Sequence, residues 1–218
     1  GKGQIAATFN VPIRTAELQG EALRCSVGSG LVADAQPAAE WAEWQHKRAF
    51  IARVSEPFEL LETLALDEGV LRHLDLHLAR LQAAAQHFNR PWPEQQIADC
   101  LNSLAAQHPA GVWRLRLTLD AQGQVDAQAA PLLPTPTPVR LQLATSPLAE
   151  ADSEFVRFKT TRRAHYSAFA PAAGSGVFDT ILHNPRGEIT ETTFGNIAMQ
   201  LVDGRWVTPP LRCGLLPG

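Results

Sequence analysis

The pattern of apolar and polar positions from residue 58 onwards predicts a strand followed by two helices. The segment FELLETLAL, residues 58–66, is typical of a strand, and DEGV supplies the turn after it. Residues 71–88 repeat apolar side chains at the spacing of an amphipathic helix, with Leu74, Leu78, Leu81 and Ala85 on one stripe. A second helix is expected over residues 94–107, with a proline just before it.

Residues 112–119 alternate strictly, which predicts a strand with one apolar face. Trp113, Leu115, Leu117 and Leu119 share that face, while Arg114, Arg116 and Thr118 lie on the other. The DAQG turn then leads to another strand. The segment PLLPTPTP, residues 131–138, is half proline and indicates a stiff extended linker with a domain boundary.

After the linker the pattern favours short strands joined by tight turns. We expect a strand over 139–143 and a short helix over 161–170. Strands follow in VFDTILH, GEITETTFGNIAMQLV and RWVTPPL, separated by NPRG and DG turns.

The first 55 residues predict a strand, a turn, a second strand and a helix. Apolar residues fill 5–13, polar residues break the run at 17–21, and a second run ends in GSGLVAD. Helix formers follow over 38–53. The chain as a whole is expected to be an α+β protein with three parts, residues 1–55, 56–134 and 135–218.

Composition narrows the function classes. The chain has 218 residues, 45% of them hydrophobic and 19% charged, and a net charge of −3. No broad basic face is available, so neither a nucleic acid nor a membrane is expected as a partner. Cys25, Cys100 and Cys213 lie far apart without CxxC spacing, which indicates no disulfide framework and no metal site, and fits a reducing cytoplasm.

The few lysines and the central carboxylates are the candidates for chemistry. Only three of the 19 basic residues are lysines, and Lys159 lies between apolar residues in FVRFKTT, where a primary amine could form a Schiff base. Glu191 lies between β-branched residues in an expected strand near a sheet centre, where a carboxylate needs a partner such as a protonated ring nitrogen. Arg80 could grip a phosphate through two hydrogen bonds. Taken singly, each of the three is also compatible with an ordinary surface position.

Other motifs give less support to any particular function. His73 and His77 are four residues apart, but without an HExxH motif or a third ligand, helix packing is the default interpretation. Two GSG triplets fit neither a GxSxG elbow nor a phosphate-binding loop, so hydrolase and nucleotide-binding functions lack support.

The order of FELLETLAL, LDLHLARLQAAAQ, FKTTRR, GEITETTFGNIAMQLVDGRWVTPPL and GLLPG resembles the fold-type IV pyridoxal-phosphate enzymes over residues 57–218. These include aminodeoxychorismate lyase, branched-chain aminotransferase and D-amino-acid aminotransferase. The resemblance implies a two-lobed fold and pyridoxal 5'-phosphate as cofactor. It implies that Lys159 forms the Schiff base, Glu191 keeps the pyridine nitrogen protonated and Arg80 contacts the phosphate. Thr192 and Asn196 occupy further positions near the cofactor.

Residues 1–55 resemble a different family, the chorismate-utilising enzymes, closest to para-aminobenzoate synthase component I. The resemblance rests on FNVPIRT and on VGSGLVADAQPAAEWAEWQHK. It implies that a remnant of a magnesium and chorismate site is formed by Arg14, Gly28, Gly30, Glu43 and Lys47. Only the last part of that fold is represented.

In this order the two segments resemble a fusion of para-aminobenzoate synthase component I with aminodeoxychorismate lyase. The resemblance implies conversion of aminodeoxychorismate into 4-aminobenzoate and pyruvate in folate biosynthesis, a homodimer, and a glutamine amidotransferase subunit as partner of the full-length fusion. Arg114 or Arg116 is a candidate for binding a substrate carboxylate, with surface exposure as the alternative.

Two other functions remain open. A class IV aminotransferase would use the same Lys159 and Glu191. A truncated, non-catalytic chain is the second alternative, since the chain lacks an initiator Met and stops at GLLPG, before the threonine turn expected to complete the phosphate site. In each catalytic case Arg80, Lys159 and Glu191 should surround one cleft.

Overall fold

The computed structural model describes residues 14–20, 22–30, 35–41, 43–44, 47 and 56–218. The chain divides into two compact units, residues 1–57 and 58–218. No helix among the described residues is long and apolar enough to cross a membrane.

The described part of the first unit is a hairpin followed by helical backbone. Strand β1 (Arg14–Gln19) pairs antiparallel with β2 (Ala22–Val27) around the positive-φ Gly20. The turn predicted over 17–21 is therefore too long, because residues 17–19 pair with β2. Described residues 37–41, 43–44 and 47 are helical, so the helix begins one residue before the predicted range of 38–53. The run expected over 5–13 lies outside the described residues.

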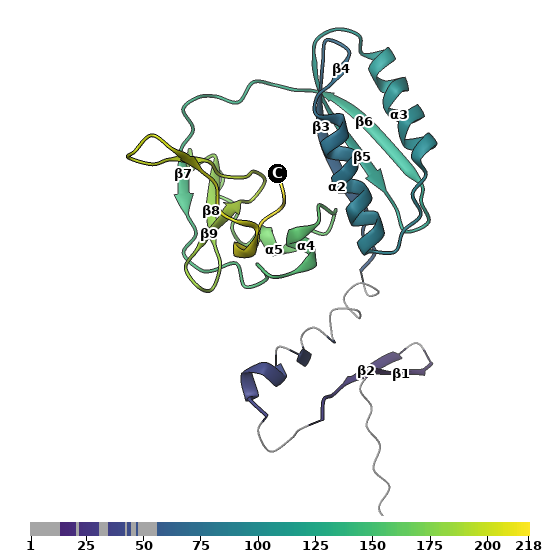
Figure 1. Ribbon diagram of the computed structural model, residues 1–218, viewed down its shortest axis with the longest axis vertical. Coiled ribbons are helices and arrows are strands. Elements are labelled where there is room, and N and C mark those ends of the chain that lie inside the picture. Colours follow the sequence, from purple (N-terminus) through teal and green to yellow (C-terminus); the bar gives the residue numbers. More distant parts are fainter. Residues whose placement is uncertain (1–13, 21, 31–34, 42, 45–46, 48–55) are drawn as a thin grey trace, which may run out of the picture. The chain divides into compact units, whose positions relative to one another are not determined.

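The first half of the second unit is an antiparallel sheet covered by two helices (Figure 1). The strand order is β4 (Val70–Leu71), β3 (Leu60–Asp67), β5 (Val112–Leu119) and β6 (Val125–Pro131). Helices α2 (Leu74–His87) and α3 (Glu94–Gln107) pack on one face, where their buried residues Leu81, Ala84, Ala85, Ile97 and Leu101 meet leucines of β3 and β5. The predicted bounds of β5 and α3 are confirmed.

Helix α2 begins three residues later than the helix predicted over 71–88. Leu71 belongs to β4, and His73 adopts a left-handed backbone conformation with φ of 52° immediately before the helix. Residues 71–73, which were predicted to be helical, therefore belong to β4 and to the turn that leads from β4 into α2.

The second half forms around a smaller sheet after the extended proline segment. Strand β7 (Leu141–Leu143) pairs parallel with β8 (Asp179–His183), which pairs antiparallel with β9 (Ile189–Thr192). Short helices α4 (Glu154–Arg157) and α5 (Ala164–Ser167) lie between β7 and β8. A separate core contains Leu148, Ala151, Val156, Tyr166 and Leu182.

Several predictions for this half were too long. The expected helix over 161–170 shrinks to α5, and α4, which Ser153 caps through a hydrogen bond to the Phe155 amide, was not predicted. The long strand expected after residue 187 is broken into β9 and β10 (Met199–Gln200), because Thr192 turns the chain by bonding to Gly195. Strand β11 (Trp206–Val207) closes a hairpin with β10.

Candidate functional site

One pocket of the second unit gathers residues from both sides of the proline segment. It is bordered by α2, by the segment from α4 to α5, by β9 with the turn after it, and by the last residues of the chain. Its lining residues are Arg80, Phe155, Val156, Phe158, Lys159, Arg163, Tyr166, Glu191, Thr192, Thr193, Phe194, Gly195, Asn196 and Leu216. Arg80, Lys159 and Glu191 thus surround one cavity, as expected for a cofactor site.

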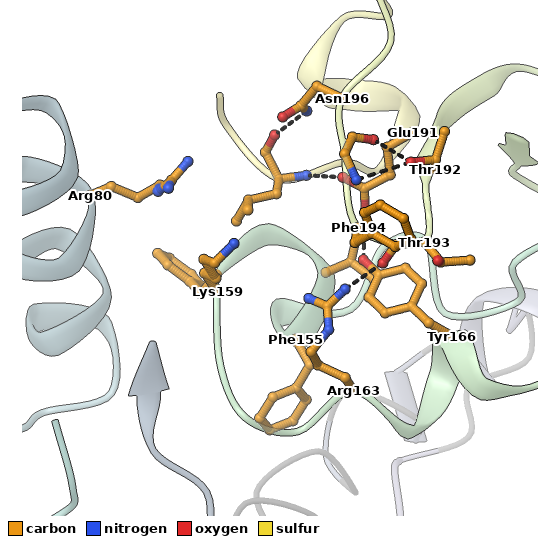
Figure 2. A pocket seen from close by; sticks show the side chains of 14 residues that line it. Arg80, Phe155, Lys159, Arg163, Tyr166, Glu191, Thr192, Thr193, Phe194 and Asn196 are labelled. Carbon is orange, nitrogen blue, oxygen red and sulfur yellow. Dashed lines mark hydrogen bonds between the residues drawn. The ribbon is translucent and has the colours of Figure 1, made fainter. Parts of the chain in front are cut away.

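Lys159 is half-buried, and its amine points into the space between Arg80 and Glu191 (Figure 2). Its backbone is fixed to β3, because the Leu61 amide donates to the Lys159 carbonyl at 3.0 Å and Thr160 bridges to Leu60. Burial lowers the pKa of the Lys159 ammonium below its ordinary value; Arg80 and Arg163 act in the same direction, and Glu62 and Glu191 oppose it. The amine is therefore closer to its neutral, nucleophilic form than a surface lysine.

Glu191 lies on β9 with only 5% of its surface exposed. The Tyr166 hydroxyl donates to Oε1 at 2.6 Å, and the Leu216 amide donates to Oε2 at 3.0 Å. Burial raises the pKa of the Glu191 carboxyl, and these two hydrogen bonds counteract it. This burial excludes the interpretation of Glu191 as a solvent-facing surface residue.

Arg80 projects from α2 and is held by a carboxylate that sequence reasoning missed. Its Nε and Nη2 donate to the two oxygens of Glu62, each at 2.7 Å, and Glu62 on β3 is 1% exposed. His77, considered above together with His73, contacts Glu62 through Nδ1 at 2.8 Å. The Nη1 of Arg80 donates to the Pro217 carbonyl at 2.5 Å.

The turn after β9 shapes the far wall of the pocket. The Thr192 hydroxyl donates to the Gly195 carbonyl at 3.0 Å, and the Asn196 amide donates to the Leu216 carbonyl at 2.9 Å. Behind the turn, buried Asp179 accepts from the Thr193 hydroxyl at 2.6 Å. Thr192 and Asn196 both line this pocket.

Four further lining or supporting residues had not been singled out from the sequence. Glu62 lies in the leucine-rich strand β3, and the argument about a buried strand carboxylate that was applied to Glu191 could have found it. Tyr166 is the single tyrosine of the chain, but nothing in its local pattern points to a site. No sequence pattern pointed to Arg163 or Phe194, because the turns around these residues bring them to the pocket.

The other residues that were expected from the sequence to bind a ligand do not line this pocket. Arg114 and Arg116 are exposed on β5 and do not line the pocket. In the first unit, Lys47 donates to the Gly28 carbonyl at 2.9 Å and forms an ion pair with Glu43. Arg14 begins β1, and Gly30 follows β2 in an exposed position. No group of acidic, histidine or cysteine residues suited to a metal ion occurs in the described part of the chain.

The donor set of the pocket fits one kind of organic cofactor. A half-buried amine can bond covalently to a carbonyl carbon, a buried carboxylate can accept from a protonated ring nitrogen, and a guanidinium can bind an anionic group. These three groups come from different elements and face the same space. The pocket therefore suits a phosphorylated heterocyclic aldehyde.

Comparison with known proteins agrees with this geometry. Residues 59–218 match the model of the amino-transferase class IV family, and residues 2–53 match that of the chorismate binding enzymes. A protein of Schizosaccharomyces pombe named "Putative aminodeoxychorismate lyase" is 33% identical over 168 residues, which cover 75% of this chain and 71% of that protein.

Solved structures share the fold. The crystal structure of a "Putative amino-acid aminotransferase" from Mesorhizobium loti matches with a TM-score of 0.67 and 34% identity over 74% of this chain and 79% of that one. A hypothetical aminotransferase from Mycobacterium tuberculosis in its PLP-bound form matches with a TM-score of 0.60 and 20% identity, over 73% of this chain and 64% of that one. This chain belongs to the amino-transferase class IV family and carries an N-terminal segment of the chorismate binding enzymes.

Proposed function

We propose that this chain binds pyridoxal 5'-phosphate and converts 4-amino-4-deoxychorismate into 4-aminobenzoate and pyruvate. The observation that carries the proposal is the convergence of the Lys159 amine, the Glu191 carboxylate and the Arg80 guanidinium on one pocket. The choice of substrate is supported by the fission yeast relative and by the chorismate-binding segment, because a full-length fusion of the two families would join two steps of 4-aminobenzoate synthesis.

Each of the three residues would hold one part of the cofactor. Lys159 would bond to its aldehyde carbon, Glu191 would accept from its ring nitrogen, and Arg80 would bind its phosphate while Glu62 keeps the guanidinium in place. When bound, pyridoxal phosphate supplies an electron sink for the pair left on a substrate carbon after proton removal.

Lys159 is the base of the proposed reaction. The substrate's amino group would take the place of Lys159 at the aldehyde carbon, which frees the lysine amine. Its lowered pKa favours the neutral amine, which would take the proton from C4 of the substrate. The enolpyruvyl group leaves with its ether oxygen as the six-membered ring becomes aromatic, and protonation of the enol gives pyruvate. The atoms of the substrate are then all contained in 4-aminobenzoate and pyruvate, and aromatisation drives the reaction forward.

An aminotransferase is the second candidate. The Mesorhizobium loti structure, named as an amino-acid aminotransferase and 34% identical, favours it. The same Lys159 would then remove a proton from an amino acid and return it elsewhere, and no leaving group would be expelled.

The experiment that separates these functions supplies pyridoxal phosphate to the purified chain and then one of two substrates. The lyase predicts 4-aminobenzoate and pyruvate in equal amounts from aminodeoxychorismate, with no 2-oxo acid required. The aminotransferase predicts amino-group exchange between an amino acid and a 2-oxo acid. Absence of a cofactor absorbance band, with neither product formed, would support a non-catalytic chain and overturn the proposal.

The same proposal includes the assembly implied by the resemblance. We expect a homodimer, and a glutamine amidotransferase subunit as partner of the full-length fusion. Sedimentation of the purified chain, with and without pyridoxal phosphate, measures the first expectation.

A further inference from the structure

Tyr166 and Glu191 form a buried hydrogen-bonded pair at the wall of the pocket. Tyr166 is 7% exposed and Glu191 is 5% exposed, and the phenol donates to Glu191 Oε1 at 2.6 Å. The other oxygen, Oε2, accepts from the Leu216 amide at 3.0 Å. Figure 2 shows the two side chains approaching from different elements, α5 and β9.

The tyrosine ring is fixed by its neighbours. The Arg163 guanidinium lies 4.6 Å from the ring centroid and donates to the Thr193 carbonyl, while the His165 ring lies 4.0 Å away. A ring held in this way presents its hydroxyl in one direction with little loss of side-chain entropy on contact. The hydrogen bond is therefore a fixed feature of the pocket wall.

We propose that Tyr166 is a positioning residue that keeps Glu191 ionised and oriented toward the cofactor's ring nitrogen. A carboxylate offers about four lone-pair sites, so the bonds from Tyr166 and Leu216 leave room for a third donor on the pocket side. The inference rests on the proposed cofactor site, and it adds to that site a residue with no direct contact to the reacting atoms.

The burial of Glu191 gives this role its physical reason. Burial raises the pKa of the Glu191 carboxyl and so favours its protonated form. A protonated carboxyl is neutral and could not hold a protonated ring nitrogen by charge. The groups that oppose burial are the Tyr166 hydroxyl, the Leu216 amide, Arg163 and Lys159. Of these, the Tyr166 hydroxyl can be removed alone, since Phe keeps the ring.

The test measures the Glu191 titration directly in the cofactor-free protein. The carbon NMR signal of the Glu191 carboxyl is assigned by its loss in Glu191→Gln and followed against pH in wild type and Tyr166→Phe. We expect its pKa to rise by about one unit or more in Tyr166→Phe, because a hydrogen bond to a charged group is lost. Thr180→Val is the matched control, because it removes a buried hydroxyl that donates to the Phe169 carbonyl at 2.6 Å without touching Glu191.

An unchanged Glu191 pKa in Tyr166→Phe, or an equal rise in Thr180→Val, would overturn the inference. In the cofactor-loaded enzyme, Tyr166→Phe should lower kcat about tenfold with KM within about twofold, and should add nothing to Glu191→Gln. Failure of wild type to bind pyridoxal phosphate would defeat the proposed function, while the titration would still decide whether Tyr166 controls Glu191.

Discussion

Burial shifts the pKa values of Lys159 and Glu191, two of the charged groups that line the pocket, in opposite directions. It lowers the pKa of the Lys159 ammonium and raises the pKa of the Glu191 carboxyl, so that it favours the neutral form of both. For a base and nucleophile this is useful. For the partner of a ring nitrogen, the role proposed for Glu191, it is not, and the hydrogen bonds from Tyr166 and Leu216 act against this effect of burial.

Replacing Lys159 tests the covalent part of the site. Lys159→Ala should abolish the cofactor absorbance band of the lysine-bound form and essentially all turnover, since nucleophile and base are removed together. Lys159→Arg is the control that keeps the positive charge, and it should fail equally. Near-normal 4-aminobenzoate production by Lys159→Ala would contradict the cofactor assignment.

Replacing Glu191 should separate cofactor binding from catalysis. Glu191→Gln retains Lys159, so the absorbance band of the bound cofactor should persist, whereas turnover should fall by orders of magnitude because an amide cannot hold the ring nitrogen protonated by charge. The measurement compares cofactor absorbance with the rate of 4-aminobenzoate formation. Equal rates in the variant and wild type would remove Glu191 from the mechanism.

His165 makes the stability of the fold sensitive to acid. Burial, together with Arg163 and Arg162, lowers its pKa to about 4 from an ordinary 6.5. Between these values the unfolded chain binds a proton that the folded chain does not, so this group reduces stability as pH falls from about 6.5 to 4. His165→Asn should make the free energy of unfolding less dependent on pH in this range, measured by urea denaturation. His73→Asn, at an exposed position, should leave that dependence in place.

At the scale of elements, the site depends on contacts that join distant segments. Arg80 on α2 is oriented by Glu62 on β3, and Lys159 is carried by a segment that bonds to the start of the same strand. The final turn of the chain, from Cys213 to Leu216, brings a backbone amide to Glu191. A displacement of any of these elements would separate Arg80, Lys159 and Glu191, which the proposed chemistry needs in one pocket.

Gly214 gives a direct test of that final turn. Its φ is 90°, and an added Cβ would overlap the Ala151 carbonyl oxygen. Gly214→Ala should therefore destabilise the second unit by about 2 to 4 kcal/mol, through backbone strain and steric overlap together. Gly174→Ala, with φ of 77° and no atom within 4 Å, should cost only about 1 kcal/mol, so equal losses in thermal denaturation would refute the steric argument.

At the scale of the whole molecule, two units carry two family resemblances. In the first unit Lys47 donates a hydrogen bond to the Gly28 carbonyl and forms an ion pair with Glu43. Three of the residues expected from a chorismate site are therefore in contact. Magnesium and chorismate would need further ligands from the earlier part of that fold. The second unit brings Arg80, Lys159 and Glu191 of the proposed cofactor site to one pocket.

We predict that this chain alone forms no aminodeoxychorismate from chorismate and ammonia. The five residues Arg14, Gly28, Gly30, Glu43 and Lys47 supply too few oxygen ligands for a magnesium ion, which prefers octahedral coordination. The assay supplies chorismate, ammonium and magnesium and follows aminodeoxychorismate by chromatography. Its formation would show a complete site in the first unit; adding a separate synthase is the positive control.

The sequence by itself determined the elements whose side-chain period is unbroken. Strict alternation identified β5, and a helix was expected at α3 after a proline. The rarity of lysine, together with a carboxylate between β-branched residues, pointed to Lys159 and Glu191. The order of motifs also carried the family, since residues 59–218 match it. These properties are local, or lie in the linear order of the chain.

Only the tertiary structure decided which side chains support the site. The pairing of Glu62 with Arg80 joins β3 to α2, and the bond from Tyr166 to Glu191 spans 25 positions of the chain. The long strand predicted after residue 187 ended early because Thr192 bonds to Gly195, a turn that β-branched residues do not signal. Buried charges need partners, and which partner reaches them depends on how turns and short helices aim side chains across space, which no periodicity records.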